Sequence, residues 1–260
     1  MLKHVKLHLN SLAPLLSFRT RAGESLNYRL YPSWSENLVV FYHGVLGDSR
    51  YLSRLAQSVA EQGLATVVTP DFRGHGLGGE APVLGKLTQL EEDFEELLVH
   101  LRFKLSVRNT VVAGHSLGGS LCLRLSQSSG ANWYAGFLAV APYLPFVTGA
   151  LRPEFQQWIR EEGENIHLMW PDSWRLGHET LKYHRSFFSA ALPDPKKNFP
   201  PNARLMLAGN DELFDSQSLG LWAKNQNLEC FVSETATHFS VATEGECLKT
   251  IAREIARFFR

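Results

Sequence analysis

Several short apolar runs, separated by segments with helical periodicity, constrain this chain more than any other feature. They occupy residues 38–42, 65–69, 109–113, 137–141 and 204–208. A continuous apolar run, as opposed to an alternating one, fits a strand that is buried on both faces of a parallel sheet. Because such strands alternate here with helical segments, the sequence predicts a parallel sheet covered by helices on both faces.

The expected helices are marked by their ends. Asp48 or Ser49 precedes apolar residues at helical spacing and Gly63 follows them, which predicts a capped helix that stops before the glycine. Thr88 and Glu91 have the spacing of a capping box at the head of a second amphipathic helix. Further predicted elements are edge strands at residues 5–9 and 25–31, a strand at 229–233, a helix at 217–225 and a last helix through Ile251, Ile255 and Phe258.

The chain length, and one interruption in the alternation of strands and helices, define the expected domains. A chain of 260 residues suits one large α/β domain. Between residues 143 and 203 no clean strand is visible, and aromatic residues, prolines and short helical patterns take its place. We expect an α/β fold whose mostly parallel sheet of about eight strands is formed by residues 1–142 and 204–260, with an inserted helical cap at 143–203.

The charge balance and the cysteines indicate which kinds of binding partner and which cellular location to expect. Lys+Arg and Asp+Glu both number 26, with no block of like charge, so nothing indicates a nucleic-acid partner. The 3 cysteines are widely spaced and fit reduced thiols better than disulfides or a metal site. The N-terminus lacks the apolar core of a signal peptide, and no stretch approaches the roughly 20 apolar residues of a membrane span. A cytoplasmic protein without an integral membrane segment is expected.

The third of the apolar runs leads into a motif that carries a candidate nucleophile. The motif reads Gly114-His115-Ser116-Leu117-Gly118 and is followed by helix formers, which predicts a strand, a sharp turn and a helix. Such a turn presents a serine hydroxyl to a base and to a substrate. Glycines two residues before and two residues after the serine avoid collisions with the neighbouring strands. Ser116 is therefore the candidate nucleophile.

A histidine and an acid follow later predicted strands. Asp211 comes after one late strand and His238 after the next. Chemistry in open α/β sheets sits at the carboxyl ends of the strands, and the order Ser, Asp, His is typical of hydrolases with this turn. We interpret His238 as the base for Ser116 and Asp211 as the group that orients the imidazole. Glu212 and Asp215 are rival acids, but Asp211 is favoured by its place immediately after the strand.

Two backbone N–H groups are candidates for an oxyanion hole. One is the amide of Leu117, at the head of the helix after the nucleophile. The other is the amide of Val45, which follows His43-Gly44, where the glycine permits a tight turn beneath the nucleophile. His43 is interpreted as fixing this loop by hydrogen bonding. His115, at the variable position of the motif, is expected to pack or bond locally.

These features together resemble the α/β-hydrolase superfamily. They are His43-Gly44, the segment 63–76 that ends in Asp-Phe-Arg-Gly-His-Gly, the motif at 114–119, Asp211 and His238. The resemblance covers nearly the whole chain outside 143–203 and is greatest to the monoacylglycerol lipase and lysophospholipase-like branch. It implies a serine hydrolase with the fold predicted above. The serine at 116 differs from the aspartate nucleophile of the epoxide hydrolase and haloalkane dehalogenase branches, which resemble this pattern.

The predicted reaction is hydrolysis of a small-molecule carboxylic ester, with several alternatives left open. The aromatics of 143–203 either line an acyl pocket, which favours a lipophilic monoacyl ester, or form the cap's own small core. The same triad would serve a thioester, an amide or peptide, or a carbon–carbon bond next to a ketone. A non-catalytic ligand-binding protein of this fold is an alternative of another class. Since no metal-ligand or nucleotide motif is visible, no metal and no cofactor are expected, and nothing in the sequence indicates the oligomeric state.

Overall fold

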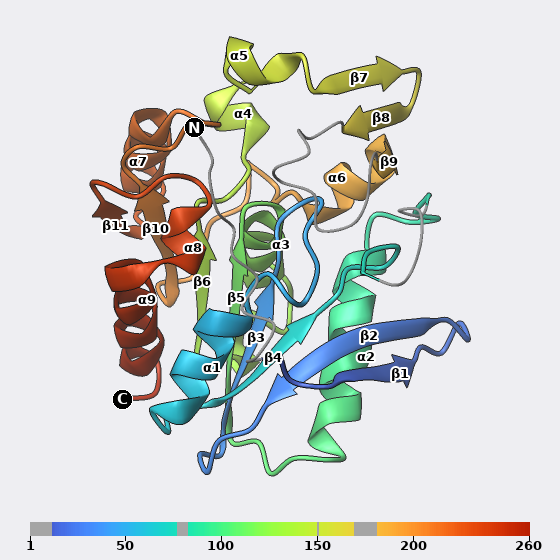
Figure 1. Cartoon of the computed structure of the whole chain (residues 1–260), viewed down its shortest axis with the longest axis vertical. Coiled ribbons are helices and arrows are strands. Elements are labelled where there is room, and N and C mark those ends of the chain that lie inside the picture. The colour runs from blue at the N-terminus through green and yellow to red at the C-terminus, as the bar shows by residue number, and fades with distance from the viewer. Residues whose placement is uncertain (1–11, 77–82, 150, 169–180) are drawn as a thin grey trace.

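A computed structural model describes residues 12–76, 83–149, 151–168 and 181–260, and the strand expected at residues 5–9 lies outside them. The described part contains a central sheet of 8 strands (Figure 1). In spatial order these are β1 (Leu15–Arg19), β2 (Ser25–Tyr31), β4 (Thr66–Pro70), β3 (Asn37–Tyr42), β5 (Asn109–His115), β6 (Gly136–Val140), β10 (Ala203–Ala208) and β11 (Glu229–Ser233). The predicted fold class is confirmed.

Strand β2 runs opposite to the other strands of this sheet. The pairs β1–β2 and β2–β4 are antiparallel, whereas every pair from β4 to β11 is parallel. The expectation that residues 25–31 form an edge strand was wrong. This strand, β2, lies between β1 and β4, and β1 is the edge strand of the sheet. The register places Tyr42 of β3 opposite Gly114 of β5. The loop after β3 therefore starts beside the turn that follows β5.

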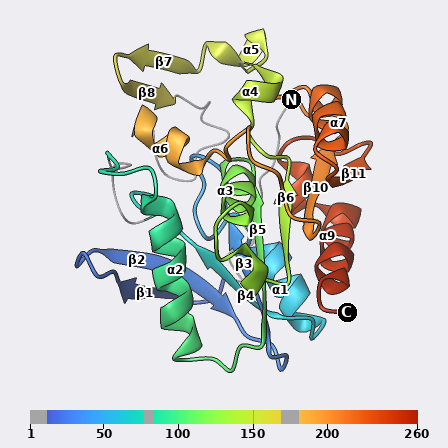
Figure 2. The ribbon, with the colours of Figure 1, turned by 180° about the vertical axis from the view of Figure 1, so that it is seen from behind.

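Helices cover both faces of the sheet (Figures 1 and 2). On one face lie α1 (Ser53–Glu61), α8 (Ser240–Thr243) and α9 (Gly245–Arg257), and on the other lie α2 (Gln89–Arg102), α3 (Leu117–Ser126) and α7 (Ser216–Asn225). Successive residues of one strand enter different cores: Val111 packs with the α1 and α9 side, and Val112 with the α2 and α3 side. Burial on both faces explains why the central strands are continuous apolar runs.

The predicted cap of α1 was wrong. The helix begins at Ser53, and Leu52 at its N-cap makes no side-chain capping bond. Asp48 instead accepts the backbone N–H of Arg50 at 2.8 Å and pairs with its guanidinium at 2.6 Å. The Ser49 amide donates to a carboxylate oxygen of Asp71 at 2.5 Å. Asp48 thus bonds within the turn that precedes the helix, and Ser49 bonds to the loop after β4.

The start of α2 was predicted correctly but its capping box was not. Thr88 occupies the N-cap position, yet its hydroxyl donates to the carboxylate of Glu92 at 3.0 Å and not to the helix backbone. Glu91 forms an ion pair with Arg124 of α3. A tertiary partner therefore takes the carboxylate that the local pattern assigned to the cap.

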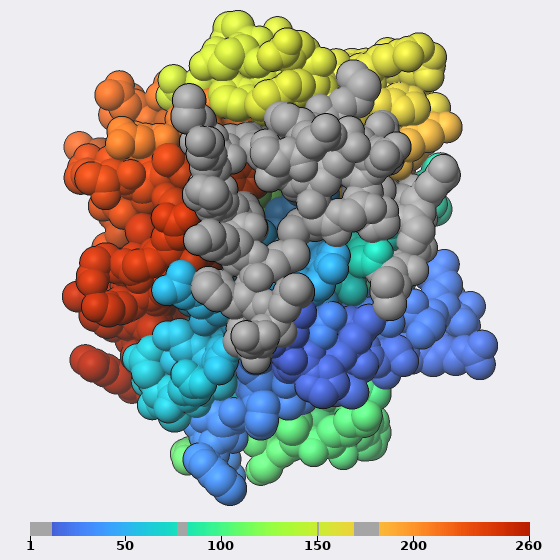
Figure 3. Space-filling model, viewed as in Figure 1, coloured from blue at the N-terminus to red at the C-terminus, as the bar shows by residue number. Residues whose placement is uncertain are grey.

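The segment between β6 and β10 is only partly helical, which corrects the expectation of a helical insertion. It contains the short helices α4 (Pro145–Thr148), α5 (Pro153–Gln156) and α6 (Arg185–Ala191) and an antiparallel sheet of β7 (Ile159–Glu162), β8 (Asn165–Leu168) and β9 (Leu181–His184). Gly163, with φ +60°, makes the turn between β7 and β8. The elements α4, α5, β7 and β8 of this segment lie at the top of the molecule in Figure 3, which is viewed as in Figure 1. Within the described residues, no helix has the length and apolarity needed to cross a membrane.

Candidate active site

The turn after β5 holds Ser116 in an unusual backbone conformation. Its φ is 53° and its ψ is −117°, a combination that costs a non-glycine residue about 1–3 kcal/mol. The Ser116 N–H donates to the carbonyl of Val140 at 3.0 Å, and the Ser116 carbonyl accepts the Tyr143 N–H at 3.1 Å. These bonds to β6 and to the residues just after it keep the serine at the head of α3.

The two glycines of the motif are required by close backbone contacts. A Cβ at Gly114 would lie 2.1 Å from the carbonyl oxygen of Gly118. A Cβ at Gly118 would lie 2.4 Å from the carbonyl oxygen of Tyr42, at the end of β3. Distances this short exclude any side chain at either position. The nucleophile turn and the end of β3 therefore pack directly against each other.

Asp211 and His238 form a buried pair at the ends of neighbouring strands. Asp211 follows β10 and His238 follows β11, and these two strands are parallel partners. The Nδ1 of His238 lies 2.8 Å from Oδ2 of Asp211, and both side chains are only 1% exposed. Because the carboxylate accepts, Nδ1 carries the hydrogen, which leaves Nε2 free to act as a base.

The second oxygen of Asp211 is held by the backbone. Its Oδ1 accepts the amides of Leu213 and Phe214, each at 2.9 Å. Burial alone would raise the pKa of Asp211, but the charge and hydrogen bond of His238, with those two amides, outweigh burial and leave the pKa below its ordinary value. Asp211 is therefore ionised at neutral pH.

The rival acids have other partners. Glu212 accepts the backbone N–H of His238 at 2.6 Å through Oε2, so it contacts the same residue but not the imidazole. Asp215 is the N-cap of α7 and accepts the Gln217 N–H at 3.1 Å. The sequence does not indicate the Glu212 contact, because it joins two loops across 26 residues of chain.

His115 joins the nucleophile turn to the loop of His238. Its Nε2 lies 2.7 Å from the His238 carbonyl oxygen, to which it donates, and the two ring centroids are 4.8 Å apart. Its Nδ1 is buried without a hydrogen-bond partner among the described residues. Burial, reinforced by nearby His238, lowers the pKa of His115 to about 3. His115 is therefore neutral. Its bond to the His238 carbonyl also ties the turn that carries Ser116 to the loop that carries His238.

The stability of the protein at acidic pH is expected to depend on His115. Its folded pKa of about 3 lies below the unfolded value, so the unfolded chain binds more protons and the free energy of unfolding falls as the pH drops below about 6.5. At about 1.4 kcal/mol per pKa unit, the loss between pH 6.5 and 4 is on the order of 3 kcal/mol. The variant His115→Gln keeps an N–H donor but does not titrate, so its loss should be smaller by this amount. Urea unfolding at a series of pH values measures the difference, and parallel curves would contradict the assignment.

The Ser116 hydroxyl and the His238 ring share no hydrogen bond in the structure, although both are described residues. Catalytic hydrogen bonds are commonly long in a site without substrate and tighten when substrate binds. The contacts that place these two residues are instead the backbone of the turn and the bond from His115 to the His238 carbonyl at 2.7 Å.

The loop after β3 lies against the nucleophile. The Nδ1 of His43 donates to the Gly44 carbonyl at 2.7 Å, and its Nε2 accepts the Phe72 N–H at 3.1 Å. Burial lowers the pKa of His43, so the ring is neutral, as this pattern of one donor and one acceptor requires. A Cβ at Gly44 would lie 3.1 Å from Cβ of Ser116. Val45 follows directly, so the structure brings it together with Ser116.

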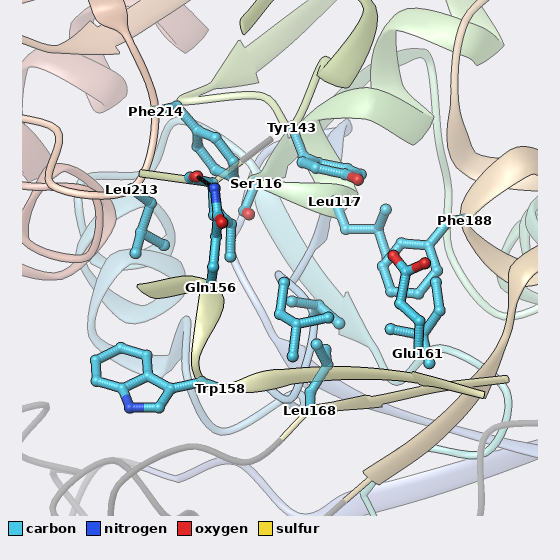
Figure 4. A pocket seen from close by; sticks show the side chains of 14 residues that line it. Ser116, Leu117, Tyr143, Gln156, Trp158, Glu161, Leu168, Phe188, Leu213 and Phe214 are labelled. Atoms are coloured by element: carbon cyan, nitrogen blue, oxygen red, sulfur yellow. Dashed lines mark hydrogen bonds between the residues drawn. The ribbon is translucent and has the colours of Figure 1, made fainter. Parts of the chain in front are cut away.

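A cavity of about 420 Å³ opens in front of Ser116. The loops of the main sheet contribute Val45, Ser116, Leu117, Leu213 and Phe214, and the segment between β6 and β10 contributes Tyr143, Leu151, Gln156, Trp158, Ile159, Glu161, Ile166, Leu168 and Phe188. Figure 4 shows Ser116 on one wall, with Trp158 and Leu168 on the opposite side. The lining of the cavity is mostly apolar, and the volume of the cavity lies in the range typical of small-molecule sites.

The described aromatics of this segment serve two purposes. Trp158 and Phe188 line the cavity, whereas Phe187 is fully buried in the core between the sheet and helices α2 and α3, and not in a separate core of the cap. Trp170 and Trp174 lie outside the described residues. The sequence contains no signal that separates these groups, because neighbouring residues of α6 point in different directions.

Comparisons with known proteins agree with this architecture. The chain is 29% identical over 113 residues to the sn-1-specific diacylglycerol lipase ABHD11 of Danio rerio, covering 43% of this chain and 34% of the relative. It is 29% identical over 121 residues to a probable alcohol acetyltransferase of Cyberlindnera jadinii, covering 43% and 33%. The match thus spans about a third of the length of these curated relatives.

Solved structures show the same fold at low sequence identity. A soluble variant of the monoglyceride lipase of Saccharomyces cerevisiae superposes with a TM-score of 0.70 at 16% identity, over 99% of this chain and 97% of that one. The alpha/beta hydrolase GrgF from Penicillium sp. sh18 gives 0.68 at 16%, over 94% and 98%. The model of the alpha/beta hydrolase family matches residues 39–239, which is most of the chain. This protein belongs to the alpha/beta hydrolase family.

Proposed function

We propose that this protein is a serine hydrolase of carboxylic esters, with Ser116 as nucleophile, His238 as general base and Asp211 as the group that orients the base. The observation that carries the proposal is the placement of Ser116. It sits in a strained turn, faces an apolar cavity and is tied through its neighbour to the buried His238–Asp211 pair.

The chemistry follows from these positions. His238 takes the proton of the Ser116 hydroxyl as its oxygen attacks the acyl carbon. The amides of Val45 and Leu117 stabilise the oxyanion of the tetrahedral intermediate. The bond to the alcohol breaks as His238 returns the proton to it, which leaves an acyl-enzyme. Water then attacks with His238 again as base, and the carboxylic acid leaves.

The substrates that fit best are lipophilic monoacyl esters, such as a monoacylglycerol or a lysophospholipid. The apolar lining of the cavity disfavours charged groups next to the acyl carbon, because burying them without partners is costly. The diacylglycerol lipase and the monoglyceride lipase among the similar proteins are named for acylglycerol substrates, which supports a lipophilic ester of this broader class.

We also propose that residues 143–203 act as a cap on a core of residues 1–142 and 204–260. This division is supported by the cavity, since most of its lining residues come from the segment between β6 and β10. A cytoplasmic location remains our prediction. It is supported by the three free thiols Cys122, Cys230 and Cys247.

Labelling with a fluorophosphonate, followed by mass spectrometry of the modified peptide, tests the proposal. A working triad should give one adduct, on Ser116. A panel of p-nitrophenyl esters graded by acyl length then defines the acyl preference, and matched thioester, anilide and β-diketone substrates test the other bond types. Folded protein that neither labels nor turns over any ester would contradict the hydrolase assignment and favour a ligand-binding role.

A further inference from the structure

A tyrosine from the segment between β6 and β10 bonds to the loop that carries Val45. Tyr183 of β9 is fully buried, and its hydroxyl oxygen accepts the backbone N–H of Leu46 at 3.0 Å. The same oxygen lies 2.7 Å from Nε2 of His75. The Nδ1 of His75 faces the Arg73 carbonyl at 3.2 Å and donates to it, which leaves Nε2 to accept from the Tyr183 hydroxyl. Burial raises the pKa of Tyr183, so the hydroxyl keeps the proton that it donates.

The turn that Tyr183 contacts has a backbone conformation that its sequence disfavours. The Gly47 N–H donates to the Gly44 carbonyl at 3.1 Å, which makes Val45 and Leu46 the central residues of a β-turn. Leu46 has a φ of 62°, the sign that a type II turn needs at this position and that glycine normally supplies. A leucine adopts this φ at an energetic cost. Some other contact must therefore hold the turn.

The Tyr183 hydroxyl can hold this turn because it binds the peptide group at the centre of the turn. Type I and type II turns differ mainly in the orientation of the central peptide, here the one that joins Val45 to Leu46. The N–H that Tyr183 accepts belongs to this peptide. Turning the peptide over would break the bond and take this donor away from the fully buried Tyr183 hydroxyl. The bond thus selects the observed turn over the one that leucine prefers.

We propose that Tyr183 is a positioning residue that holds the turn of residues 44–47 so that the Val45 amide faces the oxyanion. This inference rests on the proposed function and adds to it a structural link between the inserted segment and the catalytic loops. The turn that Tyr183 holds lies close to the nucleophile, because a Cβ added at Gly44 would lie 3.1 Å from Cβ of Ser116.

The variant Tyr183→Phe removes the hydroxyl, and with it the bonds to Leu46 and to His75. Its ring would keep its contacts with His75, Phe187 and Phe188, whose centroids lie 5.4, 5.5 and 5.3 Å away. Removing one oxyanion donor outright costs about 10²–10³ in kcat. A donor that is present but no longer held in place should cost about 10- to 100-fold. KM should change less than twofold, since Tyr183 does not line the cavity and the oxyanion bond forms in the transition state.

Tyr28→Phe is the matched control. Tyr28 is also fully buried, and its hydroxyl also bonds to a histidine, His100, with 3.0 Å between Oη and Nε2. It lies on β2, away from the cavity. This variant should lose similar stability in urea unfolding, yet keep its kcat within twofold of the wild type. An equal fall in kcat in both variants would assign the effect to general destabilisation and overturn the proposal.

Leu46→Gly supplies a rescue test, because glycine adopts a positive φ without cost. In the Tyr183→Phe background it should restore kcat several-fold, and in the wild-type background it should change kcat little. The pH at half-maximal kcat/KM should stay the same in every variant, since none of them contacts His238. Unchanged kcat in Tyr183→Phe, with an active and labelled wild type, would overturn this inference alone. A wild type that neither labels nor hydrolyses esters would overturn the proposed function, and the inference with it.

Discussion

Replacing Ser116 by alanine is expected to lower kcat for ester hydrolysis by about 10⁶-fold and to abolish the fluorophosphonate adduct. The reason is that no acyl-enzyme forms without the hydroxyl, so only the hydrogen-bond donors and the binding cavity still contribute. The variant should fold, because the backbone bonds of Ser116 to Val140 and Tyr143 do not involve its side chain. Initial rates on the best ester of the panel, with intact mass after labelling, measure the loss.

Ser126→Ala is the control for this experiment. Ser126 is also a buried serine of α3, and its hydroxyl donates to the Leu123 carbonyl at 2.7 Å, far along the helix from the cavity. Its kcat should stay within twofold of the wild type. Substantial activity in Ser116→Ala, beyond any trace of contaminating esterase, would mean that another group is the nucleophile.

The second large effect is expected from Asp211→Asn, with a fall in kcat of about 10⁴. An asparagine amide can place an N–H against Nδ1 of His238, which favours the imidazole tautomer that carries its hydrogen on Nε2. That tautomer cannot accept the proton of Ser116. Loss of the carboxylate also removes the charge that stabilises the imidazolium in the transition state. Single-turnover acylation with a p-nitrophenyl ester would isolate this step from deacylation.

Two neighbouring acids provide matched comparisons. Asp215→Asn should leave kcat within twofold, because asparagine is also a good helix N-cap. Glu212→Gln should have an intermediate effect of about tenfold or less, since an amide oxygen can still accept the His238 N–H but without the charge. If Asp215→Asn proves the more damaging of these changes and Asp211→Asn is mild, the assignment of the acid is wrong.

The Asp211 carboxylate also predicts how the free energy of unfolding changes with pH. The folded pKa of Asp211 lies below its ordinary value, so its contribution to the free energy of unfolding is fully present above about pH 4 and is lost as the pH falls further. Asp211→Asn should lack this acid-dependent loss. This window begins below the one expected for His115, so the loss between pH 6.5 and 4 reports on His115 and the Asp211 loss is added only below about pH 4.

The sheet was predictable from the sequence where burial on both faces leaves a clear pattern. Strands β3, β5 and β10 are continuous apolar runs because each contributes residues to both cores. Strands β7 to β9 are short and include charged residues such as Glu161 and Glu162, so the same criterion misses them. Gly163 was the one local signal of that hairpin.

The site was predictable where the residues depend on strand order, and not where they depend on contacts between distant loops. Asp211 and His238 follow adjacent parallel strands, so chain order alone places them at one edge of the sheet. Tyr183 bonds to a loop that is 137 residues away in the chain. Nothing in the residues around it indicates that contact. The capping errors at Asp48 and Thr88 have a related cause, because other partners took the side chains that local rules assign to the helix ends.

The bond between Tyr183 and Leu46 has a consequence for protein engineering. A chimera that exchanges the segment between β6 and β10 would exchange Tyr183 with it. In this chain that segment also bonds to the loop that carries Val45. A graft that replaces the segment should therefore keep a tyrosine at position 183, or place glycine at position 46, if the chimera is to retain its turnover rate.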